Sequence, residues 1–179
     1  MAITQGTFDT WRRSAYPGMP ADGAYKVING VRLVGGSATF GTVFSMGDKE
    51  KTVNAGASFD PAKSFGGICS RMFYQGSGAI GEETTKPFVA PATDNDKQWD
   101  LDAAVEGCWW VPVNNDAKNG DRVEVTAAGE FTSSPAGTPT VGNYYLEGAT
   151  YVSNKNHDGL IKIELTGGRQ FIEITAPAA

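Results

Sequence analysis

The chain has 179 residues, of which 40% are apolar and 11% aromatic, and its formal net charge is −5. A chain of this size can bury about 70% of its unfolded surface, so one domain is expected and a disordered or collagen-like chain is excluded. The acidic balance gives no electrostatic reason to bind nucleic acid or an anionic membrane, and no apolar run approaches the roughly 20 residues of a membrane helix.

The first 23 residues show no hydrophobic period, and Pro17 and Pro20 exclude a long helix there. We therefore predict an extended N-terminal arm over residues 1–23, followed by a single β-sandwich domain over residues 24–179. Large aromatic and basic side chains in the arm either cover one end of the protein's own core or lie on a partner, where such residues often dominate binding. The candidate binding residues are Phe8, Trp11, Arg12, Arg13 and Tyr16.

The next hundred residues contain short strand and turn signals. Tyr25 to Val34 is predicted to form a hairpin, because Asn29-Gly30 is a two-residue turn signal. Further strands are predicted over residues 37–46, 51–54 and 67–74, with a loop over residues 55–64.

Two segments resemble ligand-binding motifs. Residues 76–81 fit the dinucleotide fingerprint Gly-x-Gly-x-x-Gly, but two carboxylates and Pro87 follow, so the helix that would hold a phosphate is excluded. The acidic stretch Asp94 to Asp102 resembles a calcium loop, but Trp99 stands where the sixth-position glycine is needed and Val105 where a glutamate is needed. A solvated loop is the better interpretation.

Val105 to Phe131 gives the clearest strand signal and is predicted to be a hairpin. Val105 to Val113 is an apolar run, and the turn that follows ends in Asn119-Gly120. From Asp121 to Thr126 polar and apolar residues then alternate, as in a strand with one buried face.

Trp109 and Trp110 are adjacent in this apolar run, so a regular strand points them to opposite faces. One is expected in the core. The other is expected to be exposed, covered by the arm, or in an interface, and both are therefore candidates for an interface or exposed aromatic residue.

The last third of the chain continues the same pattern. A loop is predicted over residues 131–141, and strands over residues 149–153, 160–165 and 170–175. The whole sequence contains about ten short strands at a spacing near 8–12 residues and no convincing helical period. This pattern predicts an all-β fold, a sandwich or a barrel.

Catalytic and metal-binding patterns are weak. His157 lies in a polar turn, and neither a Gly-x-Ser-x-Gly elbow nor a zinc spacing of Cys and His is found. Cys69 and Cys108 are expected to be packed thiols, with a disulfide as the alternative. The sequence does not exclude a pair of carboxylates that hydrolyses glycosidic bonds, because such a pair is defined by its separation in space and not along the chain. We expect no catalytic residue, no cofactor and no metal.

Short motifs in a fixed order extend from residue 17 to residue 165. In chain order they are Pro17-Gly18-Met19-Pro20-Ala21-Asp22, Phe40-Gly41-Thr42-Val43, Phe65-Gly66-Gly67-Ile68, Gly120-Asp121-Arg122-Val123 with Gly129-Glu130-Phe131, and Leu146 to Tyr151 with Asp158 to Ile163. Together they resemble the structural cement, or head decoration, proteins of tailed bacteriophages.

This resemblance implies a jelly-roll-like β fold without catalysis, on the outer surface of the capsid in the virion. The implied partners are the phage major capsid protein and the protein itself, as a homodimer or other small homo-oligomer. No secretory signal is visible, so synthesis in the host cytoplasm is expected. The alternative function is a carbohydrate- or receptor-binding β-sandwich module, in which an exposed tryptophan would stack on a sugar.

Overall fold

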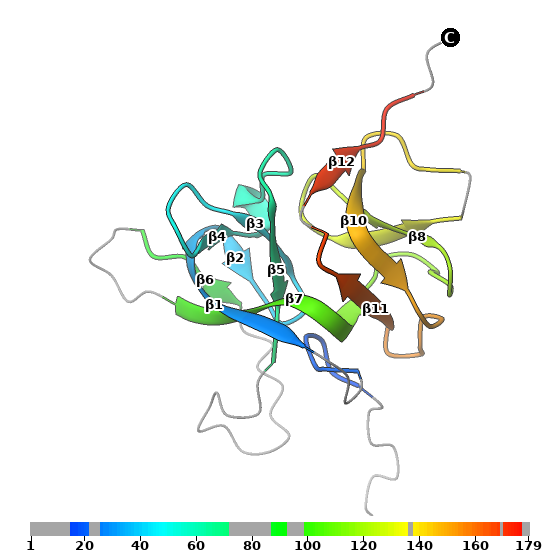
Figure 1. The fold of residues 1–179 in the computed structure, drawn as a ribbon, viewed down its shortest axis with the longest axis horizontal. Coiled ribbons are helices and arrows are strands. Elements are labelled where there is room, and N and C mark those ends of the chain that lie inside the picture. Colours follow the sequence, from blue (N-terminus) through cyan, green and yellow to red (C-terminus); the bar gives the residue numbers. More distant parts are fainter. Residues whose placement is uncertain are drawn as a thin grey trace, which may run out of the picture.

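The computed structural model describes residues 15–21, 26–71, 87–92, 99–135, 138–168 and 170–176. Within these ranges the chain consists of twelve β-strands and one 3-10 turn, η1 (Gly56–Ser58) (Figure 1). No helix in the described part is long and apolar enough to cross a membrane. The prediction of an all-β fold built as a barrel or sandwich is confirmed.

Five strands from the first two thirds of the chain close into a small barrel. In order around the barrel they are β1 (Val27–Gly35), β4 (Thr52–Asn54), β3 (Val43–Met46), β5 (Phe65–Cys69) and β7 (Trp99–Pro112). The ring closes because β1 pairs with β4 on one side and with β7 on the other. Leu33, Phe44 and Val53 are fully buried in one hydrophobic cluster of these strands.

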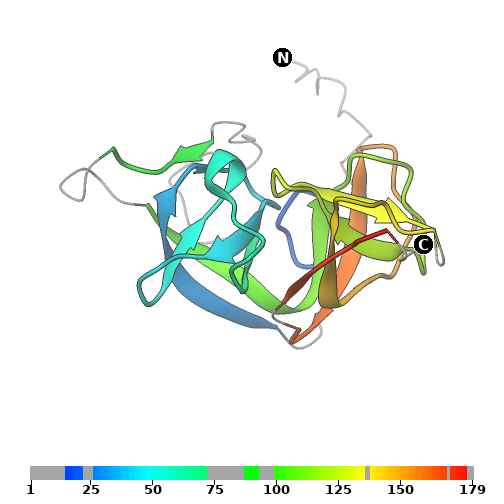
Figure 2. The ribbon, with the colours of Figure 1, turned by 90° about the horizontal axis from the view of Figure 1, so that it is seen from above.

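The same ten-stranded sheet continues beyond the barrel from the far end of β7. The strand order in this part of the sheet is β7, β11 (Leu160–Thr166), β10 (Tyr144–Tyr151), β8 (Arg122–Val125) and β9 (Phe131–Ser134), with β12 (Phe171–Glu173) also on β10. Figures 1 and 2 show β7 running from the barrel into this part of the sheet. Because β7 has 14 residues, its two halves serve two different sets of partners.

The smallest sheet pairs β2 (Ser37–Ala38) with β6 (Phe88–Val89). Phe88 and Phe40, which are partly buried, pack against the barrel cluster. The two-stranded sheet thus lies against the barrel core.

The predicted Val105–Phe131 hairpin is wrong. Both strands exist, but β11 and β10 lie between β7 and β8. The connecting segment is longer than a hairpin loop, and its backbone bonds elsewhere: the Asn114 N–H donates to the Phe131 carbonyl and the Gly120 N–H to the Tyr151 carbonyl, each at 3.1 Å. A connection of this length does not require β7 and β8 to be neighbours in the sheet.

The predicted Tyr25–Val34 hairpin is also wrong. Asn29 and Gly30 lie inside β1, where they pair with Ala103 and Asp102 of β7. The long antiparallel pairing with β7 provides the backbone hydrogen bonds for this segment, so tertiary context overrides the local turn signal.

Three further expectations differ from the structure. Residues 99–102, predicted as loop, begin β7, and residues 131–134 form β9. The strand predicted over residues 170–175 is shorter, because β12 spans only Phe171–Glu173. By contrast, the strand predicted over residues 160–165 is present as β11, with Ile161, Ile163 and Leu165 buried.

Glu124 is a fully buried carboxylate that the alternation of β8 places on the solvent side. Residues near 140 cover it instead. Its oxygens accept hydrogen bonds from the Ser134 hydroxyl, from the Thr140 N–H at 3.2 Å and from Asn143 Nδ2 at 2.9 Å. A buried charge needs such donors, so this carboxylate ties the segment before β10 to β8 and β9.

Candidate functional site

The single histidine is exposed and both cysteines are buried, so these side chains do not share a site. His157 is 74% exposed and lies 3.3 Å from Asp158, in a turn. Cys69 and Cys108 are both buried thiols, as expected. Burial, with a smaller effect of Asp102, raises the pKa of Cys69 to about 12, so this thiol stays protonated at neutral pH. Among the described residues, no group of three or more His, Cys, Asp or Glu could hold a metal ion.

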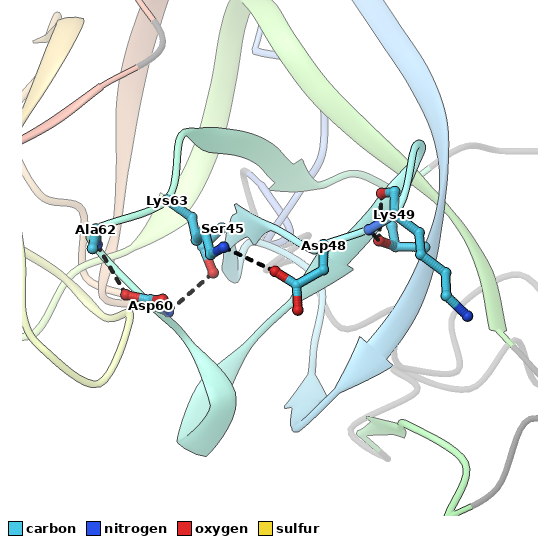
Figure 3. A network of polar contacts seen from close by, with 7 residues as sticks. Ser45, Asp48, Lys49, Asp60, Ala62 and Lys63 are labelled. Carbon is cyan, nitrogen blue, oxygen red and sulfur yellow. Dashed lines mark hydrogen bonds and ion pairs between the residues drawn. The ribbon is translucent and has the colours of Figure 1, made fainter.

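A polar network on the barrel is structural (Figure 3). Lys63 Nζ lies 2.8 Å from Asp48 Oδ1, and the Asp60 N–H donates to Ser45 Oγ at 3.0 Å. The hydrogen bond between Asp48 and Lys63 lowers the pKa of Asp48 and raises the pKa of Lys63. Both charged groups are exposed to solvent, so their pairing contributes little to the stability of the fold. The network joins the β3–β4 turn to the loop before β5.

The last part of the predicted arm is built into the body of the protein. We call residues 15–21 the arm root; Figure 1 shows it in dark blue beside β7 and the lower end of β5. The Gly18 N–H donates to the Trp110 carbonyl at 2.7 Å, the Trp110 N–H to the Met19 carbonyl at 2.9 Å, and the Ala21 N–H to the Cys108 carbonyl at 2.9 Å. The arm root thus pairs with β7 through an isolated antiparallel bridge between Pro20 and Trp109.

Its other side is bonded to Arg71, which lies two residues after the end of β5. The Arg71 N–H donates to the Gly18 carbonyl at 2.7 Å. Gly18 is buried and has φ +71°, and a Cβ added there would lie 2.5 Å from the Cys69 carbonyl oxygen. Only glycine fits this backbone conformation and this close approach without strain. The arm root is therefore held in a fixed position between β7 and residues 69–71.

Substitution of Gly18 tests this attachment. We expect Gly18→Ala to lower the free energy of unfolding by about 1–2 kcal/mol more than Gly142→Ala, because of the backbone clash. Gly142 is a matched control, since its φ is +89° but nothing lies within 4 Å of an added Cβ. The check is urea denaturation, together with hydrogen exchange of the Trp110 N–H. Equal losses for the two variants would contradict the close-packed attachment.

Of the predicted binding residues, only Tyr16 lies in the described part of the chain. Its half-buried ring lies 4.9 Å from the Arg71 guanidinium, which is also 5.3 Å from the Phe40 ring. Phe8, Trp11, Arg12 and Arg13 lie outside the described residues. An arginine between two aromatic rings gains cation–π attraction on both sides, so it fixes the position of Tyr16.

The two adjacent tryptophans have different environments. Trp109 is fully buried, and its indole N–H donates to the Glu106 carbonyl at 3.0 Å. It is therefore removed as a candidate for an exposed or interface aromatic residue, because its side of β7 faces the core. Trp110 is half-buried, and Lys162 Nζ lies 5.2 Å from its ring. Trp110 remains on the outer face.

Sequence reasoning missed three residues that organise this region. Gly18 belongs to the motif quoted above, but nothing in the motif shows that its backbone is enclosed. Arg71 and Trp99 are far from the arm in sequence, and the sequence predicts Trp99 in a loop. In the structure they are linked by contacts through Phe40 and Phe88. The only signal in the sequence that could have pointed to Arg71 and Trp99 is their residue type, an arginine and an aromatic residue beside segments without a predicted strand.

Comparisons with known proteins add independent findings. Residues 4–166 match the family model described as "Structural cement protein (E217 gp24/Pam3 gp6)". Among solved structures, a chain of "The capsid of Myoviridae Phage XM1" is similar, with a TM-score of 0.60 and 12% sequence identity. The similarity covers 93% of this chain and 98% of that chain, and at this identity it shows the fold alone. A comparison with curated proteins gives no match.

Proposed function

Because this chain belongs to the phage structural cement protein family, we propose that it binds the outside of the major capsid shell and bridges neighbouring capsid subunits. It is a structural protein of the phage virion, where it stabilises the head. The family match carries this proposal, since the match spans residues 4–166 and therefore includes most of the arm as well as eleven of the twelve described strands.

In this proposal the arm is the main anchor on the shell. Phe8, Trp11, Arg12 and Arg13 precede the arm root, and Trp and Arg are frequent anchors in interfaces. Tyr16 is the last of the proposed capsid-binding residues. Support comes from the arm root, because its hydrogen bonds to β7 join the arm to the body of the protein at a defined point.

Two finer features belong to the proposal. Residues 1–23 act as an arm and residues 24–179 as one β-sandwich domain, except that residues 18–21 also bond to β7. The protein also contacts its own copies on the capsid as a dimer or other small homo-oligomer. Many weak contacts between copies that already share one shell sum to strong attachment.

Deletion of residues 1–14 tests the anchor. We expect affinity for phage heads assembled without this protein to fall at least tenfold, because the anchors are lost. The melting temperature should stay within a few degrees, because the arm root is retained. Co-sedimentation with heads gives the affinity and circular dichroism gives the melting temperature.

A deletion of residues 177–179 is the matched control, since it removes a terminus but no aromatic or basic residue. Head binding by the 1–14 deletion at the wild-type level would exclude the arm as the anchor. If the full-length protein itself does not bind heads, attachment to the outside of the shell is refuted.

A further inference from the structure

The first half of β1 has a free backbone edge. β4 pairs with β1 only from Arg32 onward, so residues 27–31 have no described strand on that side. The pairing stops at Lys51, whose carbonyl accepts the Arg32 N–H at 2.8 Å and whose φ of +56° is left-handed. Residues 47–51 form the turn between β3 and β4 instead of continuing beside β1.

The backbone groups of Ile28 and Gly30 point to this free edge. In an antiparallel pair, every second residue directs its N–H and C=O to the partner strand, and the residues between direct them away. Gly30 pairs with Asp102 of β7, but the Asp102 carbonyl accepts the Ser70 N–H at 2.8 Å, on the β5 side of β7. The Gly30–Asp102 pair is therefore not hydrogen-bonded, and the same holds two residues earlier at Ile28.

The edge is open to a partner strand. Gly30 is exposed, its φ is not left-handed, and nothing lies within 4 Å of a Cβ added there. Glycine inside a strand often marks a place where another backbone approaches closely. Beside the edge lies a cleft of about 490 Å³, whose lining includes Ile28, Lys51 and Glu106.

The outermost strand of the sheet, by contrast, is blocked. β9 ends the strand order, and the Asn115 side chain accepts the Ser133 N–H at 3.1 Å and donates to the Ser133 carbonyl at 2.6 Å. This side chain occupies the bonds that a further strand would make. No side chain in the described part of the chain occupies Gly30 in this way.

We propose that the free edge of β1 pairs with the same edge of a second copy, antiparallel and about a two-fold axis. The inference rests on the part of the proposed function in which copies contact one another. Two outward residues separated by one are their own complement in this arrangement. Ile28 of each copy faces Gly30 of the other, which allows about four backbone hydrogen bonds across the interface.

The charges that line the cleft favour a second copy as the occupant. Lys51 lies at the Arg32 end of the edge, with Glu50 beside it. Glu106 lies at the other end, where it pairs with Val27. A two-fold axis between the ends brings the Lys51 end of each copy toward the Glu106 end of the other. The contact is small, so we expect weak association in solution that is strengthened among copies held on one shell.

Cross-linking tests the predicted register. Asn29 is exposed and lies between the two outward residues, so the pairing places it opposite Asn29 of the second copy. In such a non-hydrogen-bonded pair the Cα atoms are about 4.5 Å apart, which suits a disulfide. With oxidised glutathione, we expect Asn29→Cys to form covalent dimers at least tenfold faster than Ile172→Cys, the control on an exposed residue of β12. Cys69 and Cys108 are buried, and non-reducing gel electrophoresis gives both rates.

Two second-site variants test the backbone bonds. In the Asn29→Cys background, Gly30→Pro removes the outward N–H but no bond to β7, whereas Gly30→Ala keeps this donor. We expect the proline variant to cross-link as slowly as Ile172→Cys, and the alanine variant to stay within twofold of Asn29→Cys. Equal rates for the proline and alanine variants would overturn the predicted pairing. So would equal rates for Asn29→Cys and Ile172→Cys, a comparison that does not depend on how well the proline variant folds.

The outcomes also separate this inference from the proposed function, because cross-linking in solution needs no heads. If wild-type protein binds heads but Asn29→Cys cross-links no faster than its control, only the pairing is refuted. If Asn29→Cys cross-links but wild-type protein does not bind heads, attachment to the shell fails and the pairing stands. Protection of residues 28–31 from hydrogen exchange on heads, without cross-linked dimers, would assign the edge to the capsid protein and overturn the inference.

Discussion

Trp109→Ala is expected to lower the free energy of unfolding by about 3–5 kcal/mol, the usual cost of truncating a large buried aromatic residue. Trp109 is fully buried in the larger hydrophobic cluster, where it pairs across the sheet with Ile163. The substitution leaves a cavity in a closely packed core and removes the donor that bonds the Glu106 carbonyl. Urea denaturation followed by circular dichroism measures the loss.

Trp110→Ala is the matched control for that experiment. Trp110 is the next residue of the same strand, but it is half-buried and contacts Lys162 on the outer face. Its truncation should cost about 1 kcal/mol, from a partly solvated cation–π contact and a smaller buried area. If the two variants were destabilised equally, the division of this pair between core and outer face would be contradicted.

Glu124→Ala is expected to lower the free energy of unfolding by about 2–4 kcal/mol. The side chain is fully buried, and its removal leaves Ser134, the Thr140 N–H and Asn143 without their acceptor. Losing the acceptor of buried donors costs more than the net value of the bonds themselves. The segment around Thr140 should also become accessible, which limited proteolysis would detect.

Glu130→Ala provides the comparison for Glu124→Ala. Glu130 is also a glutamate near β8 and β9, and it accepts a hydrogen bond from Asn114 Nδ2 at 2.7 Å, but it is exposed. Because water replaces an exposed acceptor, its loss should cost at most about 0.5 kcal/mol. A cost for Glu124→Ala that is no larger would mean that the carboxylate does not hold the covering segment in place.

The contrast between Glu124 and its strand neighbours shows how far periodicity predicts burial. Val123 and Val125 are buried as the alternation predicts, because a strand points alternate side chains to one face. Glu124 is buried as well, because a segment sixteen residues later covers the opposite face there. Alternation assigns a side chain to a face, but it contains no information about what covers that face.

The two hairpin signals show the same limit for strand pairing. Asn119-Gly120 and Asn29-Gly30 are equally good local turn signals. Gly120 does adopt a positive φ, of +85°, within the connection between β7 and β8, but the two strands are not neighbours. Gly30 lies within a paired strand. Pairing depends on which strands together bury their apolar faces, and this choice involves the whole chain.

For the candidate interface, too, the sequence and the structure each supply a part. The sequence predicts an aromatic and basic arm and contains the family motifs, because residue type and order are properties of the chain itself. It also predicted two tryptophans on opposite faces. Which of them is buried was decided by the direction of β7 relative to the core, with Trp109 inward and Trp110 outward.

By itself, the sequence determined the all-β class, the apolar faces of strands such as β8 and β11, and membership of the cement protein family. These follow from local alternation, turn residues and short motifs. Only the tertiary structure decided that β7 joins a closed barrel to the rest of the same sheet, that the arm root bonds to β7, and that contacts through Arg71, Phe40 and Phe88 connect Tyr16 to Trp99. All three depend on contacts between residues tens of positions apart, and such contacts form only when the complete chain packs.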